Sequence, residues 1–138
     1  MTIRKLTGDD IAYVAEMQKM QGLKSPVFDS IPDDWSVYAA FDEEKIVSIC
    51  YLFRYKRIPH ADYPTGTVAE LGGAYTLPEY RGKGIMSAIV KELIGNCEKD
   101  LGKVDALIAD STDDAYGIYI KNGAHDSTEH RIWWQLGK

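Results

Sequence analysis

A glycine-rich turn between a strand and a long helix is the feature that most constrains the fold of this chain. Before the turn, residues 67–76 have the composition of a strand, and after it apolar residues recur at helical spacing from Met86 to Cys97. Residues 104–109 then form a nearly continuous apolar run, which is typical of a buried parallel strand. If the two strands share a sheet, their connection is a right-handed crossover. The sequence therefore predicts an α/β domain, with an α+β mixed sheet.

The remaining segments complete this predicted sheet. Thr7 is expected to cap a first helix, with Asp10 three residues further on. Gly72 and Gly73 are adjacent inside a predicted strand, which indicates a bulge or the close approach of another group. Further elements are expected as strands over residues 2–6, 35–41, 46–55 and 131–136, an irregular loop over 21–34, a long helix ending at Gly102, and a short helix over 112–121.

Length and composition describe one ordinary domain over residues 1–138, and the 45% hydrophobic and 27% charged content argues against disorder. The net charge of −5 argues against nucleic-acid binding and is compatible with a cationic substrate such as an amine. Cys50 and Cys97 lack metal-ligand spacing, so no metal site is expected. The sequence has no signal core and no apolar run near the roughly 20 residues of a membrane span. We therefore expect a cytoplasmic protein with no membrane partner.

The turn itself has the features of an anion-binding site. Gly82 and Gly84 let backbone N–H groups turn inward without a Cβ clash. The helix that follows leaves its first N–H groups unpaired and positive. Arg81 and Lys83 add positive charge beside them. Together these features predict a cradle for a phosphate or pyrophosphate.

Three other interpretations of the turn stay open. A P-loop requires G-x-x-x-x-G-K-[ST], but Leu77 occupies the first glycine position and Gly84 the last position. A Rossmann site requires G-x-G-x-x-G, but Ser87 replaces the third glycine and no clear ribose-binding acid follows. The third interpretation is a glycine-rich turn with a basic pair that binds nothing.

The turn also carries a family motif. Arg81-x-x-Gly84-x-Met86 resembles the acyl-CoA signature of the GNAT superfamily of acyl-CoA-dependent N-acetyltransferases, [QR]-x-x-G-x-[GA]. The two departures from the family that bear on the cofactor are Met86 in place of a small residue and Thr112 in place of Asn; Ala124 also replaces an aromatic residue. The resemblance extends downstream, where Thr112-x-x-Ala115-x-x-Ile118-Tyr119-x-Lys121-x-Gly123 is similar to the family segment N-x-x-A-x-x-[LF]-Y-x-K-x-G. With both motifs and the order of the predicted elements, the resemblance covers nearly the whole chain.

The resemblance implies a GNAT-like acyl-CoA N-acyltransferase fold and transfer of an acetyl group from acetyl-CoA, the donor cosubstrate, to a primary amine. The acceptor would be an unidentified small molecule or peptide, attacked directly in a ternary complex. Tyr119 would donate a proton to the leaving thiolate, helped by a small downward shift of its pKa, and Glu70 would be the general base. The alternatives are that Tyr119 only packs the short helix and that Glu70 is a solvated or salt-bridged strand residue. The cofactor-binding residues would be Tyr75, Thr76, Leu77, Arg81, Gly82, Lys83, Gly84, Ile85, Met86, Ser87 and Thr112.

A function of a different class stays open beside this one. It is a non-catalytic acyl-CoA-binding or sensory domain of the same fold. The departures from the family motif at Met86 and Thr112 support this alternative. Acceptor contacts are also undecided. One of Trp133 and Trp134 is expected in the core and the other at the acceptor site or at the contact of a homodimer. Further candidates for the acceptor site are the alternating Tyr51, Phe53 and Tyr55, which otherwise form an ordinary covered sheet face, and the loop residues Asp29, Asp33 and Asp34.

Overall fold

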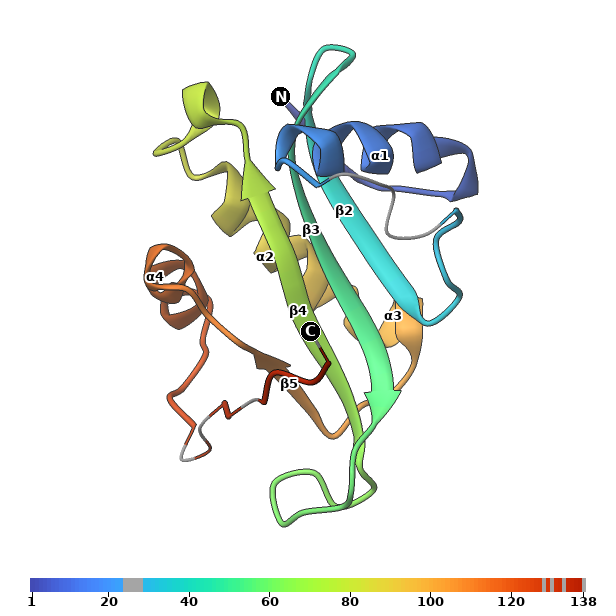
Figure 1. Ribbon diagram of the computed structural model, residues 1–138, viewed down its shortest axis with the longest axis vertical. Coiled ribbons are helices and arrows are strands. Elements are labelled where there is room, and N and C mark those ends of the chain that lie inside the picture. Colours follow the sequence, from blue (N-terminus) through green and yellow to red (C-terminus); the bar gives the residue numbers. More distant parts are fainter. Residues whose placement is uncertain (24–28, 128, 130, 133, 138) are drawn as a thin grey trace.

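The structure is a computed structural model that describes residues 1–23, 29–127, 129, 131, 132 and 134–137 (Figure 1). Within these residues the strands form one five-stranded sheet in the order β1-β2-β3-β4-β5. The first four strands are antiparallel neighbours, and β5 runs parallel to β4. The mixed sheet confirms the predicted fold class. The strands are β1 (Thr2–Lys5), β2 (Trp35–Asp42), β3 (Lys45–Lys56), β4 (Thr67–Thr76) and β5 (Ala106–Ala109).

Helices cover both faces of this sheet. In the view of Figure 1, α1 (Ile11–Met20) lies in front of the sheet, and α2 (Ile85–Gly95) and α3 (Cys97–Leu101) lie behind it. These two helices make the predicted crossover from β4 to the parallel β5, and α4 (Asp113–Lys121) follows β5. Within the described ranges, no helix is both long and apolar enough to cross a membrane.

The two-residue period of the strands explains how one sheet holds both layers. In β2, the Tyr38 hydroxyl donates to Asp100 of α3 over 2.9 Å. The Phe41 ring instead meets the ring of Tyr13 on α1, with centroids 5.0 Å apart. The core between sheet and helices is apolar and closed, and its fully buried members include Ile49, Leu52, Ile89 and Leu93.

Gly73 produces the predicted irregularity in β4. The register between β3 and β4 shifts between Ile49 and Tyr51, and Gly73 has a φ of 64°. A Cβ at Gly73 would lie 2.4 Å from Cδ1 of Tyr51, closer than two carbon atoms can approach. Both sequence expectations for the paired glycines, a bulge and the close approach of another group, are therefore confirmed.

The expected single helix after the glycine-rich turn is wrong, because the helix is divided at Asn96. This residue has φ −104° and ψ 5°, and its side-chain Nδ2 donates to the carbonyl of Glu92 over 2.9 Å. The bond gives a carbonyl of the last turn of α2 a side-chain partner. Gly102, with φ 87°, ends the second piece as predicted.

The expected strand over residues 131–136 is not present in its described part. Residues 131, 132 and 134–136 form no ladder with any described strand, and Ile132 and Trp134 are 72% and 77% exposed. An apolar alternation indicates which side chains could be buried, but it supplies no partner for the backbone hydrogen bonds that a strand needs. Trp133 lies outside the described residues, as do residues 24–28 of the predicted loop.

Candidate active site

The glycine-rich turn opens α2 with unpaired backbone donors. Gly82 and Gly84 have φ values of 75° and 78°, in the left-handed region where glycine is favoured. A Cβ at either position would meet no atom within 4 Å, so backbone conformation rather than crowding selects glycine here. The N–H groups of residues 84–87 donate no hydrogen bond to any residue that the structure describes. This helix start therefore has free donors for an anion.

The basic side chains of the turn have different surroundings. The Arg81 Nε donates to the carbonyl of Thr76 over 2.8 Å, and its guanidinium lies over the Tyr75 ring, 5.4 Å from the centroid. Arg81 thus fixes the path of the chain where β4 ends. The Lys83 ammonium instead lies over the Tyr80 ring, 5.4 Å from the centroid, and belongs to the residue directly before Gly84.

The apolar residues of the predicted cofactor set lie under the turn. Ile85 and Met86 are 8% and 9% exposed and belong to the main core cluster. Met86 therefore faces the core, and these two residues can meet a cofactor through their backbone. Leu77 is also buried, and its N–H already donates to the carbonyl of Val47 over 2.9 Å. Its amide is consequently not free to polarise a thioester.

β4 loses its β5 neighbour before it reaches the turn. β5 pairs only with Val68–Leu71, so within the described residues the stretch 72–76 of β4 has no strand beside it on that edge. Tyr75 and Thr76 lie in this stretch, and the Thr76 hydroxyl lies 2.7 Å from the Ser48 hydroxyl on β3. A parting of two parallel strands leaves backbone groups that an extended ligand can use.

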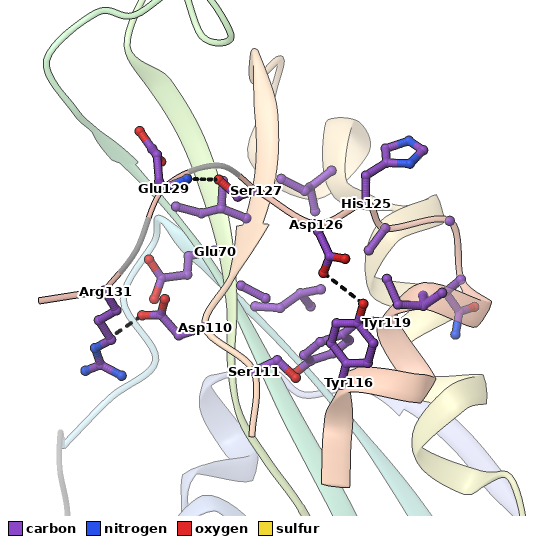
Figure 2. Close-up of a pocket in the computed structure, with 18 of the residues that line it drawn as sticks. Glu70, Asp110, Ser111, Tyr116, Tyr119, His125, Asp126, Ser127, Glu129 and Arg131 are labelled. Carbon is purple, nitrogen blue, oxygen red and sulfur yellow. Dashed lines mark hydrogen bonds and ion pairs between the residues drawn. The ribbon is translucent and has the colours of Figure 1, made fainter. Parts of the chain in front are cut away.

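A cavity of about 1020 Å³ lies where the two strands part. Figure 2 shows Glu70 from β4 on one side of it and Tyr119 from α4 on the other. Thr112, at the N-cap position of α4 but without a side-chain capping bond, also lines the cavity. Glu70 shares a sheet face with its partner Phe53, and Leu71, which also lines the cavity, points to the opposite face. The cavity therefore reaches both faces of the sheet around the end of β5.

The two candidate catalytic residues have different environments. The Glu70 carboxylate accepts a hydrogen bond from the Tyr55 hydroxyl over 2.7 Å. Tyr119 is 8% exposed, and burial raises the pKa of its phenol to about 12, with the nearby Cys50 adding to the shift. The direction is opposite to the expected downward shift, because low-polarity surroundings penalise the phenolate. Tyr119 is therefore a protonated donor at any ordinary pH.

A side-chain bond joins the turn to the cavity. Ser87 in the first turn of α2 accepts a hydrogen bond from Nδ2 of Asn122 over 3.1 Å, and Asn122 lines the cavity at the end of α4. This bond links Ser87 to the wall of the cavity that Glu70 and Tyr119 line, whereas of the other residues expected to bind a cofactor only Thr112 lines that cavity.

Comparison with known proteins decides the family. The family model described as the acetyltransferase (GNAT) domain matches residues 2–125 of the chain. This protein belongs to the GNAT acetyltransferase family. No curated protein matches the chain.

Several solved structures resemble this GNAT protein over nearly its whole length, and at their identities the likeness shows the fold alone. A predicted acetyltransferase with acetyl-CoA from Clostridium acetobutylicum has a TM-score of 0.72 and 19% identity, and the match covers 99% of this chain and 95% of that one. A GCN5-related N-acetyltransferase from Ralstonia eutropha has a TM-score of 0.73 and 14% identity, with 96% and 97% covered. A ribosomal-protein-alanine N-acetyltransferase from Brucella melitensis has a TM-score of 0.69 and 18% identity, with 97% and 100% covered.

Sequence reasoning missed some polar groups of this GNAT site. Asp110 and Arg131 line the cavity as a pair, with Arg131 Nε 3.5 Å from Asp110 Oδ2 (Figure 2). Nothing in the local sequence indicates this pair, because it joins the end of β5 to a segment that follows α4. For the bond from Tyr55 to Glu70, strand alternation indicates only the face of Tyr55, and the bond itself depends on the register between β3 and β4. Among the described residues, no group of three or more His, Cys, Asp and Glu side chains is placed to hold a metal ion.

Proposed function

We propose that residues 1–138 form one N-acetyltransferase domain that transfers an acetyl group from acetyl-CoA to a primary amine of a small molecule or peptide. The observation that supports this most directly is a cavity lined by both Glu70 and Tyr119, whose wall residue Asn122 is hydrogen-bonded to Ser87 at the helix start with free amides. The reaction needs a bound donor, a deprotonated amine and a stabilised leaving thiolate. Each of these can be matched to groups in this site.

The helix start fits the charged part of the donor. Acetyl-CoA contains a diphosphate, and the free N–H groups of residues 84–87 with Lys83 beside them have the chemistry to hold it. The open edge of β4 at residues 72–76 supplies backbone groups for the pantetheine arm and for the thioester carbonyl. A preorganised donor to such a carbonyl typically lowers a barrier by about 3–4 kcal/mol.

Glu70 and Tyr119 then act on the protons of the transfer. Glu70 removes a proton from the acceptor ammonium, so that the neutral amine can attack the acetyl carbonyl. The new C–N bond forms in the ternary complex as the C–S bond breaks. The attacking nitrogen gives up its second proton to solvent as the amide forms, and the sulfur leaves as a thiolate. Tyr119 donates a hydrogen bond to that sulfur and lowers the cost of its negative charge. The acceptor is proposed to be cationic before reaction because Glu70 and Asp126 line the cavity (Figure 2).

The second candidate, a non-catalytic acyl-CoA-binding or sensory domain, is favoured by one observation. The Tyr119 phenol has a pKa of about 12, whereas a thiol has one near 8.5, so complete proton transfer to the thiolate would be uphill. In this alternative the same helix start binds the donor, and no acceptor is turned over.

Binding and turnover measured together separate these functions. Acetyl-CoA at about 100 times its Kd should add about 2.7 kcal/mol to the free energy of unfolding. Release of CoA is then followed with a panel of amines. Tyr119→Phe should lower turnover by roughly 100-fold or more with little loss of acetyl-CoA affinity. Tyr13→Phe, on α1, is the control for loss of a phenol hydroxyl.

The results divide as follows. Stabilisation by acetyl-CoA without turnover of any amine would favour the non-catalytic domain. Unchanged turnover in Tyr119→Phe would remove the role of that hydroxyl, and unchanged turnover in Glu70→Gln would remove the base. Absence of any stabilisation by acetyl-CoA would contradict the proposal as a whole.

A further inference from the structure

A stack of aromatic side chains leads along the sheet to Glu70. Trp35 on β2 lies opposite Phe53 on β3, and Phe53 lies opposite Glu70 on β4. Antiparallel partners share a face, so all three side chains are on one side of the sheet. The rings of Trp35 and Phe53 are stacked with centroids 4.9 Å apart and planes 21° apart. Those of Phe53 and Tyr55 are stacked at 5.6 Å and 23°.

The last ring of the stack holds the carboxylate. The Tyr55 hydroxyl donates to Oε1 of Glu70 over 2.7 Å, a short bond of the charge-assisted kind. Burial and this carboxylate raise the pKa of Tyr55 to about 12, so its hydroxyl keeps its proton over the working range of the protein. Oε1 is held by this bond, and Oε2 accepts no hydrogen bond from any described residue, so Oε2 is the oxygen with both lone pairs available to another partner.

The charged groups around the cavity have partners of their own. The Arg57 guanidinium lies 3.8 Å from Glu129, and Arg131 lies 3.5 Å from Asp110. The Tyr116 hydroxyl donates to Asp126 over 2.8 Å. The remaining titratable side chains of the cavity wall are Tyr119 and His125. Within the part of the chain that the structure describes, Tyr55 is the side chain that bonds Glu70 directly.

We propose that Tyr55 is a positioning residue for Glu70, held in place by its stack on Phe53 and Trp35. The inference rests on the proposed role of Glu70 as general base. A glutamate side chain has several rotatable bonds. Anchoring Oε1 leaves the side chain fewer conformations, so less entropy is lost when Oε2 meets the acceptor ammonium. A hydrogen bond to the charged form also favours the carboxylate that can accept the proton. Oε2 takes the proton from nitrogen, and Tyr55 keeps its own.

The test compares Tyr55→Phe with Glu70→Gln and with the double variant, using the pH profile of kcat/KM for the acceptor. In Tyr55→Phe the acid limb should move to higher pH, because the carboxylate loses the hydrogen bond that Tyr55 donates to it. The acetyl-CoA Kd should stay the same. In the double variant, kcat/KM should equal that of Glu70→Gln, because Tyr55 acts through that carboxylate alone.

Two further variants control for structure. Tyr38→Phe removes a comparable phenol-to-carboxylate bond, from Tyr38 to Asp100, on the opposite face of the sheet, and its acid limb should stay where the wild-type limb lies. Phe53→Leu keeps the Tyr55 hydroxyl but removes the stack, so its acid limb should move in the same direction by a smaller amount. This variant also tests the inference if Tyr55→Phe fails to fold.

Each outcome decides between the two proposals. If Glu70→Gln is as active as wild type, the base role fails and the positioning role fails with it. If Glu70→Gln is impaired while Tyr55→Phe keeps the wild-type profile, the base role stands and the inference is overturned. A loss in Tyr55→Phe that is equal at every pH and adds to the loss in Glu70→Gln would also overturn it, since it would indicate a general structural effect.

Discussion

Gly84→Ala tests whether the left-handed turn before α2 is the donor-binding element. Gly84 has a φ of 78°, and an L-residue in that conformation costs roughly 1–2 kcal/mol. A Cβ there meets no atom within 4 Å, so nothing braces the turn in its strained shape and the free protein can relax. Relaxation turns the first amides of α2 away from their present positions, and the ligand must then restore them.

The strain therefore divides between two measurable losses. Strain energy that the free protein retains lowers its melting temperature, by at most about 3–7 °C for a chain of 138 residues. Strain energy that the free protein releases by relaxing must be restored on binding, so it weakens acetyl-CoA binding by at most about 5–30-fold in Kd. Since the new methyl group has no neighbours, we expect most of the loss in binding.

Calorimetric titration with acetyl-CoA and a thermal melt of the free protein measure the two parts. Gly95→Ala is the matched control, because this glycine is in the same helix, its Cβ would also meet nothing, and its φ is not positive. It should gain roughly 0.5–1 kcal/mol in stability and keep its affinity. If neither the Kd nor the melting temperature changed in Gly84→Ala, the turn would have relaxed at no cost to binding, and the assignment of the donor diphosphate to this turn would be refuted.

Three further predictions concern stability and reactivity. Arg4 holds the pKa of Asp10 at about 2, below its ordinary 3.8, so this pair stabilises the fold above pH 4 and its contribution is lost as the pH falls from about 4 to about 2. The Arg4–Asp10 pair contributes at most about 2 kcal/mol, because Arg4 is 42% exposed and solvent screens the interaction. In urea unfolding, the difference in stability between wild type and Asp10→Asn should close between about pH 4 and about pH 2. A difference that stays constant over this range would contradict the linkage. Gly73→Ala should cost roughly 2–5 kcal/mol in urea unfolding, since its methyl group would collide with the Tyr51 ring and its φ is 64°; a loss below about 1 kcal/mol would be inconsistent with that contact. Burial raises the pKa of the Cys50 thiol to about 12, so Ellman's reagent should label it only after unfolding, and rapid labelling of the native protein would show the thiol to be accessible.

Local backbone requirements made much of the fold predictable. The left-handed glycines of the turn and the close approach at Gly73 are properties of a few consecutive residues, and the structure has them where the sequence indicated. The division of the long helix at Asn96 was not predictable from apolar spacing, because its six apolar positions continue through the break. What marks the break is the backbone conformation of Asn96, with φ −104° and ψ 5°, accompanied by a side-chain bond to the Glu92 carbonyl.

The site was less predictable because it depends on long-range packing. Glu70 and Tyr119 meet in one cavity because β5 ends at Ala109, a length that the apolar run of residues 104–109 does not determine. The pKa of Tyr119 depends on how deeply α4 buries it, and its expected downward shift assumed positive neighbours. The position of Tyr55 could have been inferred from strand alternation, but its bond to Glu70 required the register between β3 and β4.

Ile85 and Met86 lie under the glycine-rich turn and are part of the hydrophobic core. Cofactor affinity in this protein should therefore respond to substitutions that never touch the ligand. A smaller side chain beneath the first turn of α2 would loosen the packing that holds the backbone amides in place. More conformational entropy would then be lost when the donor binds. Mutant libraries designed to change cofactor preference should therefore vary the buried residues under the first turn of α2 together with the glycine-rich turn.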